Sequence, residues 1–118
     1  MPDFRPLVIR LQDAEWDLST CEKLRFLLIA ATNQPSVIID MSAVTFMDAT
    51  CLGKLASMQR ERLCKAALRP AALVVAYPPL RRLFKLVGFE QAWPIFSTLD
   101  EALADGSPHD DLDYKAAI

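Results

Sequence analysis

The residues best suited to chemistry lie close together, in the stretch from Thr45 to Gly53 (TFMDATCLG). Asp48 is of a type favoured at a helix N-cap, and Thr50 then falls in the first helical turn, beside unpaired backbone N–H groups and the positive end of the helix dipole. A phosphate on that hydroxyl would meet those donors, while the Asp48 carboxylate would repel it. The pattern allows a phosphorylation switch at Thr50, although an arbitrary Asp-x-Thr is more often only a cap and a helix start.

The same stretch contains Cys51, and a thiol in the first turn of a helix can have a lowered pKa and act as a nucleophile. Two observations weigh against a catalytic thiol. The sixth residue after Cys51 is Ser57, where a phosphatase loop has arginine, and the only histidine, His109, lies in a polar C-terminal segment. Burial as a small apolar side chain is the alternative. We predict that the chain is not an enzyme.

Metal and nucleotide sites are not predicted. Asp40 and Asp48 flank one expected strand-to-helix connection, but the Asp-Asp pair of a Mg²⁺-binding receiver domain is missing near the first strand. The pair Gly53-Lys54 lacks the upstream glycine and the following Ser or Thr of a P-loop. The three cysteines are widely spaced without a Cys-x-x-Cys pair, so neither zinc nor a disulfide is expected. We expect no metal and no other cofactor.

Alternating strands and helices must position these residues. Apolar runs predict strands over 7–11, 37–41, 73–76 and 95–96, of which 37–41 has the continuous pattern of a strand covered on both faces. Apolar residues at helical spacing predict helices that begin near residues 20, 48 and 80, and a capping box at Thr98 and Glu101 opens a short fourth helix. The chain is therefore expected to be an α/β domain with a mostly parallel sheet of four to five strands and about four helices.

Several local features carry expectations of their own. Ser19 and Glu22 have the spacing of a capping box, and residues 13–17 are interpreted as a polar turn around Trp16. Trp16 is either a core residue or an interface anchor, whereas Trp93 is expected in the core. The basic residues over 60–69 and 81–85, Arg62 among them, are expected on solvated helix faces.

Length and composition limit the class of protein. With 118 residues, 53% hydrophobic and 24% charged, the chain is expected to form one folded domain over residues 1–104, followed by a mobile polar tail over 105–118. Thirteen basic residues against fifteen acidic ones argue against nucleic acid as the main partner. The sequence has no membrane-spanning apolar run and no secretion signal, so we expect a cytoplasmic protein that is a monomer or a weak dimer.

Read with their flanks, residues 37–42 (VIIDMS) and 44–53 (VTFMDATCLG) resemble the signature of the STAS family (sulfate transporter and anti-sigma-factor antagonist). That family typically has a strand ending in Asp-Leu-Ser and then Phe-Met/Ile-Asp-Ser-Ser-Gly-Leu-Gly. Residues 15–18 (EWDL) and the segments 83–89, 94–96 and 100–103 also resemble it, so the similarity covers roughly residues 7–104. The resemblance implies a single STAS-like domain.

The resemblance also implies a non-enzymatic switch. In the anti-sigma-antagonist branch, the unphosphorylated domain binds a serine/threonine kinase that acts as an anti-sigma factor, the kinase phosphorylates the second hydroxyl of Asp-Ser-Ser, and a phosphatase resets the switch. By position, Thr50 matches the acceptor, Asp48 the acid at its side, and Asp17 the acid of the earlier loop that contacts the partner. The implied partner-binding face comprises Asp17, Asp48, Ala49, Thr50, Cys51, Gly53 and Lys54.

The sequence departs from the family pattern at three consecutive positions. Ala49 and Thr50 replace the two serines, and Cys51 replaces the following glycine, which adds a side chain where a partner would approach. Only six residues precede the first expected strand, so the family's N-terminal antiparallel strand is expected to be short or missing. The alternative function is therefore a constitutive STAS subunit or scaffold, as in a lipid-transport ABC system or a signalling assembly, with no phosphorylation cycle.

Overall fold

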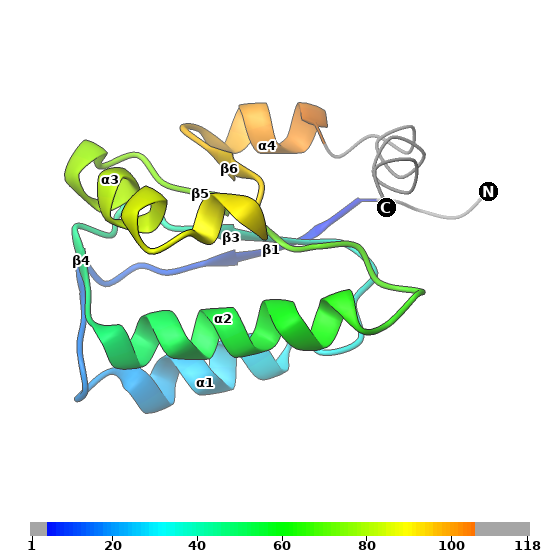
Figure 1. The fold of residues 1–118 in the computed structure, drawn as a ribbon, viewed down its shortest axis with the longest axis horizontal. Helices are drawn as coiled ribbons and strands as arrows, with labels where there is room; N and C mark the ends of the chain where they lie inside the picture. Colours follow the sequence, from blue (N-terminus) through cyan, green and yellow to red (C-terminus); the bar gives the residue numbers. More distant parts are fainter. Residues whose placement is uncertain (1–4, 106–118) are drawn as a thin grey trace.

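Four parallel strands form the main sheet of the computed structural model, which describes residues 5–105 (Figure 1). The sheet has the order β1-β3-β5-β6, with β1 at Leu7–Arg10, β3 at Val37–Asp40, β5 at Ala72–Val74 and β6 at Ile95–Phe96. The helices are α1 (Cys21–Ile29), α2 (Ala49–Leu63), α3 (Pro78–Leu86) and α4 (Leu99–Asp105), and a 3₁₀ turn, η1, covers Phe89–Gln91. The predicted fold class is confirmed.

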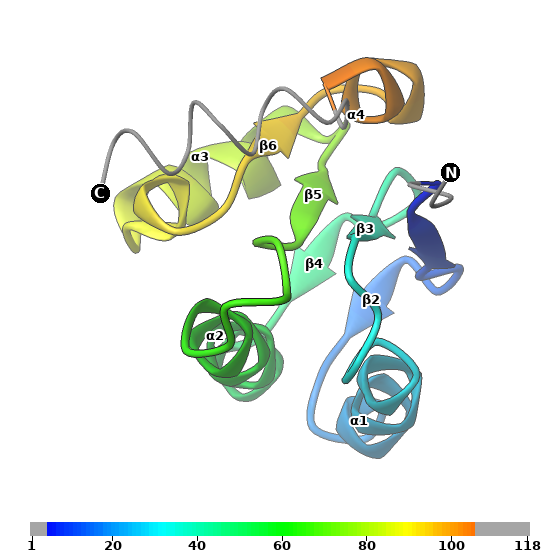
Figure 2. The same ribbon diagram turned by 90° about the vertical axis from the view of Figure 1, so that its right-hand side faces the viewer.

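Side chains alternate between the two faces of each strand, and this alternation divides the core in two. Ile39 and Leu73 point to the face that packs against α1, α2 and α3. Ile38 and Val74, their neighbours in sequence, point to the opposite face and pack against Ala102 of α4. In Figure 2, α1 and α2 accordingly lie on one side of the strands and α4 on the other. All four residues of β3 are buried, which confirms that this strand is covered on both faces.

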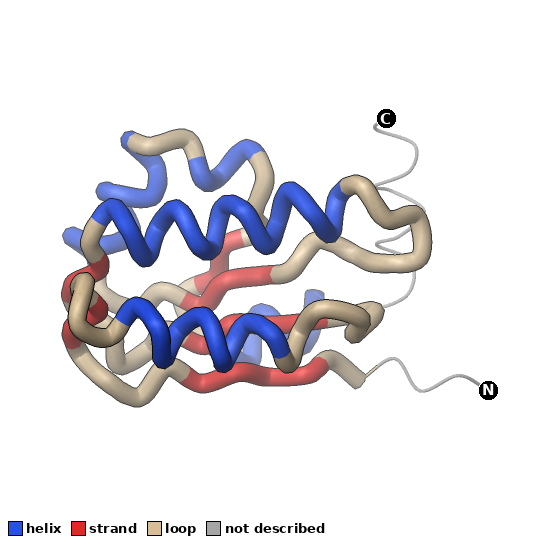
Figure 3. Tube along the Cα trace, turned by 90° about the horizontal axis from the view of Figure 1, so that it is seen from below, coloured by secondary structure: helices blue, strands red, loops and turns tan. Residues whose placement is uncertain are grey.

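A second, two-stranded parallel sheet was not predicted. It consists of β2 (Glu15–Trp16) and β4 (Phe46–Met47), with Trp16 paired to Met47. The interpretation of residues 13–17 as a polar turn is thus wrong at positions 15 and 16, because the pairing that makes them a strand comes from a segment about thirty residues later. In Figure 3 this short strand pair lies at one end of α1 and α2, and these two helices run side by side.

The helix caps agree with the sequence in two cases and differ in one. Asp48 caps α2, and the capping box of α4 is present, since Glu101 N donates to Thr98 Oγ1 at 3.2 Å and Thr98 N to Glu101 Oε1 at 3.1 Å. The predicted capping box at Ser19 and Glu22 is wrong. Helix α1 has Thr20 at its N-cap without a side-chain cap bond, because the Ser19 hydroxyl donates to Asp17 instead.

Two large side chains are buried where the sequence left the choice open or favoured solvent. Trp16 is a core residue, with its indole N–H donating to Asp13 O at 2.8 Å, and Trp93 is in the core as expected. Arg62 is only 2% exposed, so its placement on a solvated helix face is wrong. Its guanidinium lies inside the protein because four backbone carbonyls surround it there.

Some expectations fall on residues that lie outside the described range. These are residues 106–118 of the predicted tail over 105–118, which include His109, and residues 1–4, where an N-terminal antiparallel strand would begin. Asp105, placed at the start of the tail, belongs to α4. None of the helices within residues 5–105 combines the length and the hydropathy that a membrane span requires.

Candidate functional site

The short sheet places two acidic loops side by side. Trp16 pairs with Met47, and Asp48 N donates to Trp16 O at 2.9 Å, so the chain leaves β2 at Asp17 and β4 at Asp48 next to each other. Each strand leads directly toward a helix, α1 after Asp17 and α2 after Asp48. The two acids that were predicted to share one face are therefore brought to one edge of the molecule.

Thr50 lies in the first turn of α2 and is exposed. Asp48, the N-cap, has extended backbone angles and accepts a hydrogen bond from Cys51 N at 3.0 Å, which fixes the start of the helix. Ala49 and Gly53, on the same part of the helix, are exposed as well. In the described part of the chain the Thr50 hydroxyl has no hydrogen-bond partner, so it is available to a reagent that approaches from solvent.

The cap at Asp48 has a measurable energetic role. Replacing Asp48 with alanine removes the bond to Cys51 N and is expected to lower the free energy of unfolding by about 1 kcal/mol. Urea denaturation followed by circular dichroism measures this change. Glu61→Ala, an exposed acid farther along α2, is the control and should change stability by less than about 0.5 kcal/mol. Equal stabilities of the two variants would contradict the capping role.

The Asp17 loop is ordered by its own side chains. Asp17 Oδ1 accepts from Ser19 Oγ at 2.5 Å and from Ser19 N at 2.9 Å, and these bonds hold the pKa of the Asp17 carboxyl below its usual value. Thr20 Oγ1 accepts from Asp17 N at 2.8 Å. The loop therefore presents a carboxylate that stays ionised at neutral pH and keeps a fixed position.

Cys51 is not on the surface, which corrects its assignment to the partner-binding face. Its side chain is fully buried, and its thiol donates to Asp17 O at 3.6 Å. Burial raises the pKa of the Cys51 thiol to about 12, and the neighbouring Cys21 and Asp48 add to the rise. The thiol is thus protonated at neutral pH and joins the Asp17 loop to α2. A role as a nucleophile would need a lowered thiol pKa, so that the thiolate forms near neutral pH.

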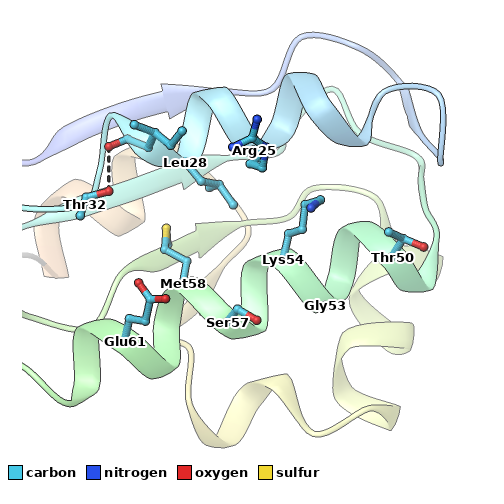
Figure 4. Close-up of a pocket in the computed structure, with 10 residues that line it drawn as sticks. Arg25, Leu28, Thr32, Thr50, Gly53, Lys54, Ser57, Met58 and Glu61 are labelled. Carbon is cyan, nitrogen blue, oxygen red and sulfur yellow. Dashed lines mark hydrogen bonds between the residues drawn. The ribbon is translucent and has the colours of Figure 1, made fainter.

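A groove of about 510 Å³ runs between α1 and α2 from Thr50 (Figure 4). Lys54, one turn after Thr50, extends from α2 toward α1. Arg25 borders the groove from α1, and Ser57 and Glu61 continue its α2 side. The structure thus gathers Thr50, Gly53 and Lys54 on one wall of this groove, while Asp17 lies in the adjoining loop.

Three residues at this edge were not singled out from the sequence. Leu18 is 73% exposed and Phe46 is 49% exposed, each within two residues of Asp17 or Asp48. Phe46 could have been found, because it precedes buried Met47 in an apolar segment whose side chains alternate. Arg25 could not have been found from the sequence, because no local pattern shows which helix lies opposite α2. Exposed apolar side chains beside fixed charges are typical of a protein-binding surface.

The chemistry available at this edge is acceptance of a group on a hydroxyl and recognition of another protein. Within residues 5–105 no cluster of three or more His, Cys, Asp or Glu side chains could hold a metal ion. The only ionisable group in the first turn of α2 is the Cys51 thiol, which is protonated and fully buried.

Comparison with known proteins gives a consistent result. The sequence model of the STAS domain matches residues 4–102. A solved structure of an anti-sigma factor antagonist from Mycobacterium paratuberculosis is 31% identical, with a TM-score of 0.71 over 82% of this chain and 81% of that one. A sulfate transporter family protein from Wolinella succinogenes shares the fold, at 19% identity and a TM-score of 0.68 over 90% of this chain and 88% of that one. A search of curated proteins found no match.

Proposed function

The chain belongs to the STAS domain family, and from this premise we propose that it is a regulatory protein without enzymatic activity, an anti-sigma-factor antagonist. Its partner is a serine/threonine kinase that acts as an anti-sigma factor, and its place is the cytoplasm. The observation that carries the proposal is the exposed Thr50 hydroxyl in the first turn of α2, beside Asp48. The similarity to a solved anti-sigma factor antagonist at 31% identity supports it.

The proposed switch is phosphoryl transfer to Thr50. Thr50 Oγ1 attacks the γ-phosphorus of ATP bound to the kinase, and its proton passes to a base on the kinase. The new O–P bond forms as the bond to the β,γ-bridging oxygen breaks, so that ADP leaves. A phosphatase restores the hydroxyl by hydrolysing the phosphate ester with water. This chain supplies only the acceptor and the surface on which the kinase docks.

Charge explains how the phosphate would release the kinase. We call the edge formed by the Asp17 loop and the start of α2 the docking edge. Asp17 and Asp48 already make this edge acidic, and the lowered pKa of Asp17 means that its carboxylate stays ionised at neutral pH. Phosphorylation adds a charge of about −1.5 to −2 at Thr50. A kinase surface that fits the neutral hydroxyl closely would have to bury this charge beside Asp48, and an unpaired buried charge is costly. Leu18 and Phe46 would supply the apolar part of the contact in either state.

The second candidate is a constitutive subunit of a larger complex. The exposed apolar side chains of Leu18 and Phe46 favour it, because a permanent interface is more apolar than a transient one. In that case Thr50 would be a helix-start residue within the interface, and its modification would play no part.

One binding experiment separates the two functions. The full chain, its Thr50→Glu variant and its Ala67→Glu variant are used to pull down the partner, with and without phosphatase treatment. The switch predicts that Thr50→Glu weakens binding, that phosphatase strengthens binding of the wild type, and that Ala67→Glu binds normally. Ala67 is a suitable control because it is exposed, lies beyond the far end of α2 and does not border the groove. Binding that responds neither to phosphatase nor to Thr50→Glu would reject the switch in favour of the constitutive subunit.

A further inference from the structure

We propose that Lys54 is the intramolecular counter-ion of a phosphate on Thr50, so that phosphorylation both adds an anion to the docking edge and withdraws a free cation from it. This inference rests on the proposed function, since it concerns the phosphorylated form of Thr50. It names a positioning residue that the family signature does not contain, because Lys54 follows the last glycine of the matched motif.

The position of Lys54 suits this role. Thr50 and Lys54 are four residues apart on α2, and side chains at that spacing are neighbours on one helix face. Both border the groove between α1 and α2, and in Figure 4 Lys54 extends from α2 into this groove. Lys54 is half-buried, so part of its stem packs against the protein, as is typical of lysine side chains that keep their ammonium in water. Among the described residues, no carboxylate pairs with its ammonium.

The other cations near the groove already have partners. Arg25 Nε lies 2.9 Å from Glu22 Oε2, and its guanidinium lies 5.0 Å from the ring centroid of Phe26. Lys23, on the same helix, lies 2.7 Å from Asp13 Oδ2. Lys54 is therefore the nearby cation that can form an ion pair with a new phosphate without breaking an existing one.

The anions around Thr50 are held away from Lys54. Asp48 is engaged with Cys51 N at the cap, and Asp17 with Ser19 in the adjoining loop. Glu61 also borders the groove but lies seven residues beyond Lys54, about two helical turns away. A phosphate on Thr50 would lie between the repelling Asp48 and the attracting Lys54, and rotation about its ester bond would carry it toward Lys54.

Two general effects favour the pair. An anion that precedes a lysine by four residues in a helix has the more stabilising orientation, and a phosphate in the first turn also interacts well with the helix dipole. The consequence is a change of surface pattern. Before phosphorylation the groove offers Lys54 to a carboxylate of the partner, and after phosphorylation that ammonium is bound to the chain's own phosphate. A partner that uses Lys54 would lose the contact without any movement of the helices.

The test installs the phosphate without a kinase. Phosphoserine is incorporated at position 50 of the full chain by codon-directed synthesis, and ³¹P NMR follows its second ionisation at low salt. With Lys54 present we expect a phosphate pKa lower by about 0.3 than in the Lys54→Met variant, since an opposite charge favours the dianion. Lys54→Arg should restore most of the shift, because it keeps the charge.

The control is Lys65→Met, which removes an exposed lysine just beyond the far end of α2 and should leave the phosphate pKa unchanged. All variants carry phosphoserine at position 50. Equal phosphate pKa values with Lys54 present and in Lys54→Met would overturn the inference, and so would a change of the same size in Lys65→Met. The result does not depend on whether any kinase recognises Thr50. Failure of the proposed function and failure of the Lys54 pair are therefore distinguishable.

Discussion

Replacing Thr50 with alanine is expected to abolish phosphate transfer from the partner kinase to this chain while the domain stays folded. The reason is that Thr50 Oγ1 is the proposed acceptor, and this exposed hydroxyl has no hydrogen-bond partner within residues 5–105 that the fold would lose. Alanine is also the better helix former, and Asp48 still caps α2. Transfer of labelled phosphate from ATP by the purified kinase, followed by mass spectrometry of the modified peptide, measures the effect.

The matched control is Ser57→Ala, which removes another exposed hydroxyl from the same helix and the same groove. The kinase should phosphorylate this variant to the same extent as the wild type. Thr50→Glu should in addition weaken the complex with the kinase by about tenfold, or about 1.4 kcal/mol, because it places a charge beside Asp48 at the docking edge. Undiminished phosphorylation of Thr50→Ala would show that the acceptor lies elsewhere.

The second large effect concerns stability. Arg62→Ala is expected to lower the free energy of unfolding by about 3 kcal/mol, with a fall in Tm of roughly 15 °C. Arg62 Nε donates to Arg69 O at 2.9 Å, Nη1 to Ala31 O at 3.0 Å, and Nη2 to Gln34 O at 2.8 Å and Pro35 O at 3.1 Å. Removing the side chain leaves four carbonyl groups without this donor and opens a cavity.

The position of these carbonyls makes Arg62 a bridge between two loops. Ala31, Gln34 and Pro35 belong to the connection between α1 and β3, and Arg69 belongs to the connection between α2 and β5. Burial lowers the pKa of the Arg62 guanidinium, but a guanidinium still keeps its charge at neutral pH. Lysine would not replace it, because a single ammonium cannot match four acceptors with the planar fork of arginine.

Urea denaturation of Arg62→Ala, Arg62→Lys and Arg60→Ala tests this role. Arg60 lies two residues earlier on the same helix and is exposed, so its replacement should change the free energy of unfolding by less than about 0.5 kcal/mol. We expect Arg62→Lys to lose much of the stability that Arg62→Ala loses. A change below about 1 kcal/mol in Arg62→Ala would mean that the buried guanidinium contributes little beyond the cost of its burial.

Local sequence determined the elements and the location of the candidate site. Apolar patterns predict the four strands of the main sheet and the first three helices because the period of a strand or helix is visible within a short segment, and a capping box predicts α4. Asp48 at the cap and Thr50 in the first helical turn follow from the same helical geometry, and the structure confirms both placements. The sequence motif 37–53 identifies the family for the same reason, since it is contiguous.

The tertiary structure decided which of these residues face solvent and which lie together. Successive helix residues point about 100° apart, so whether Cys51 or Thr50 faces outward depends on where α2 meets the core. The pairing of β2 with β4, which brings Asp17 beside Asp48, joins segments about thirty residues apart. Arg62 could be buried only because two distant loops turn their carbonyls toward one point. Contacts between segments that are far apart in the chain leave no periodic pattern in either segment. The sequence alone therefore predicts helices, strands and caps, but not which distant residues meet.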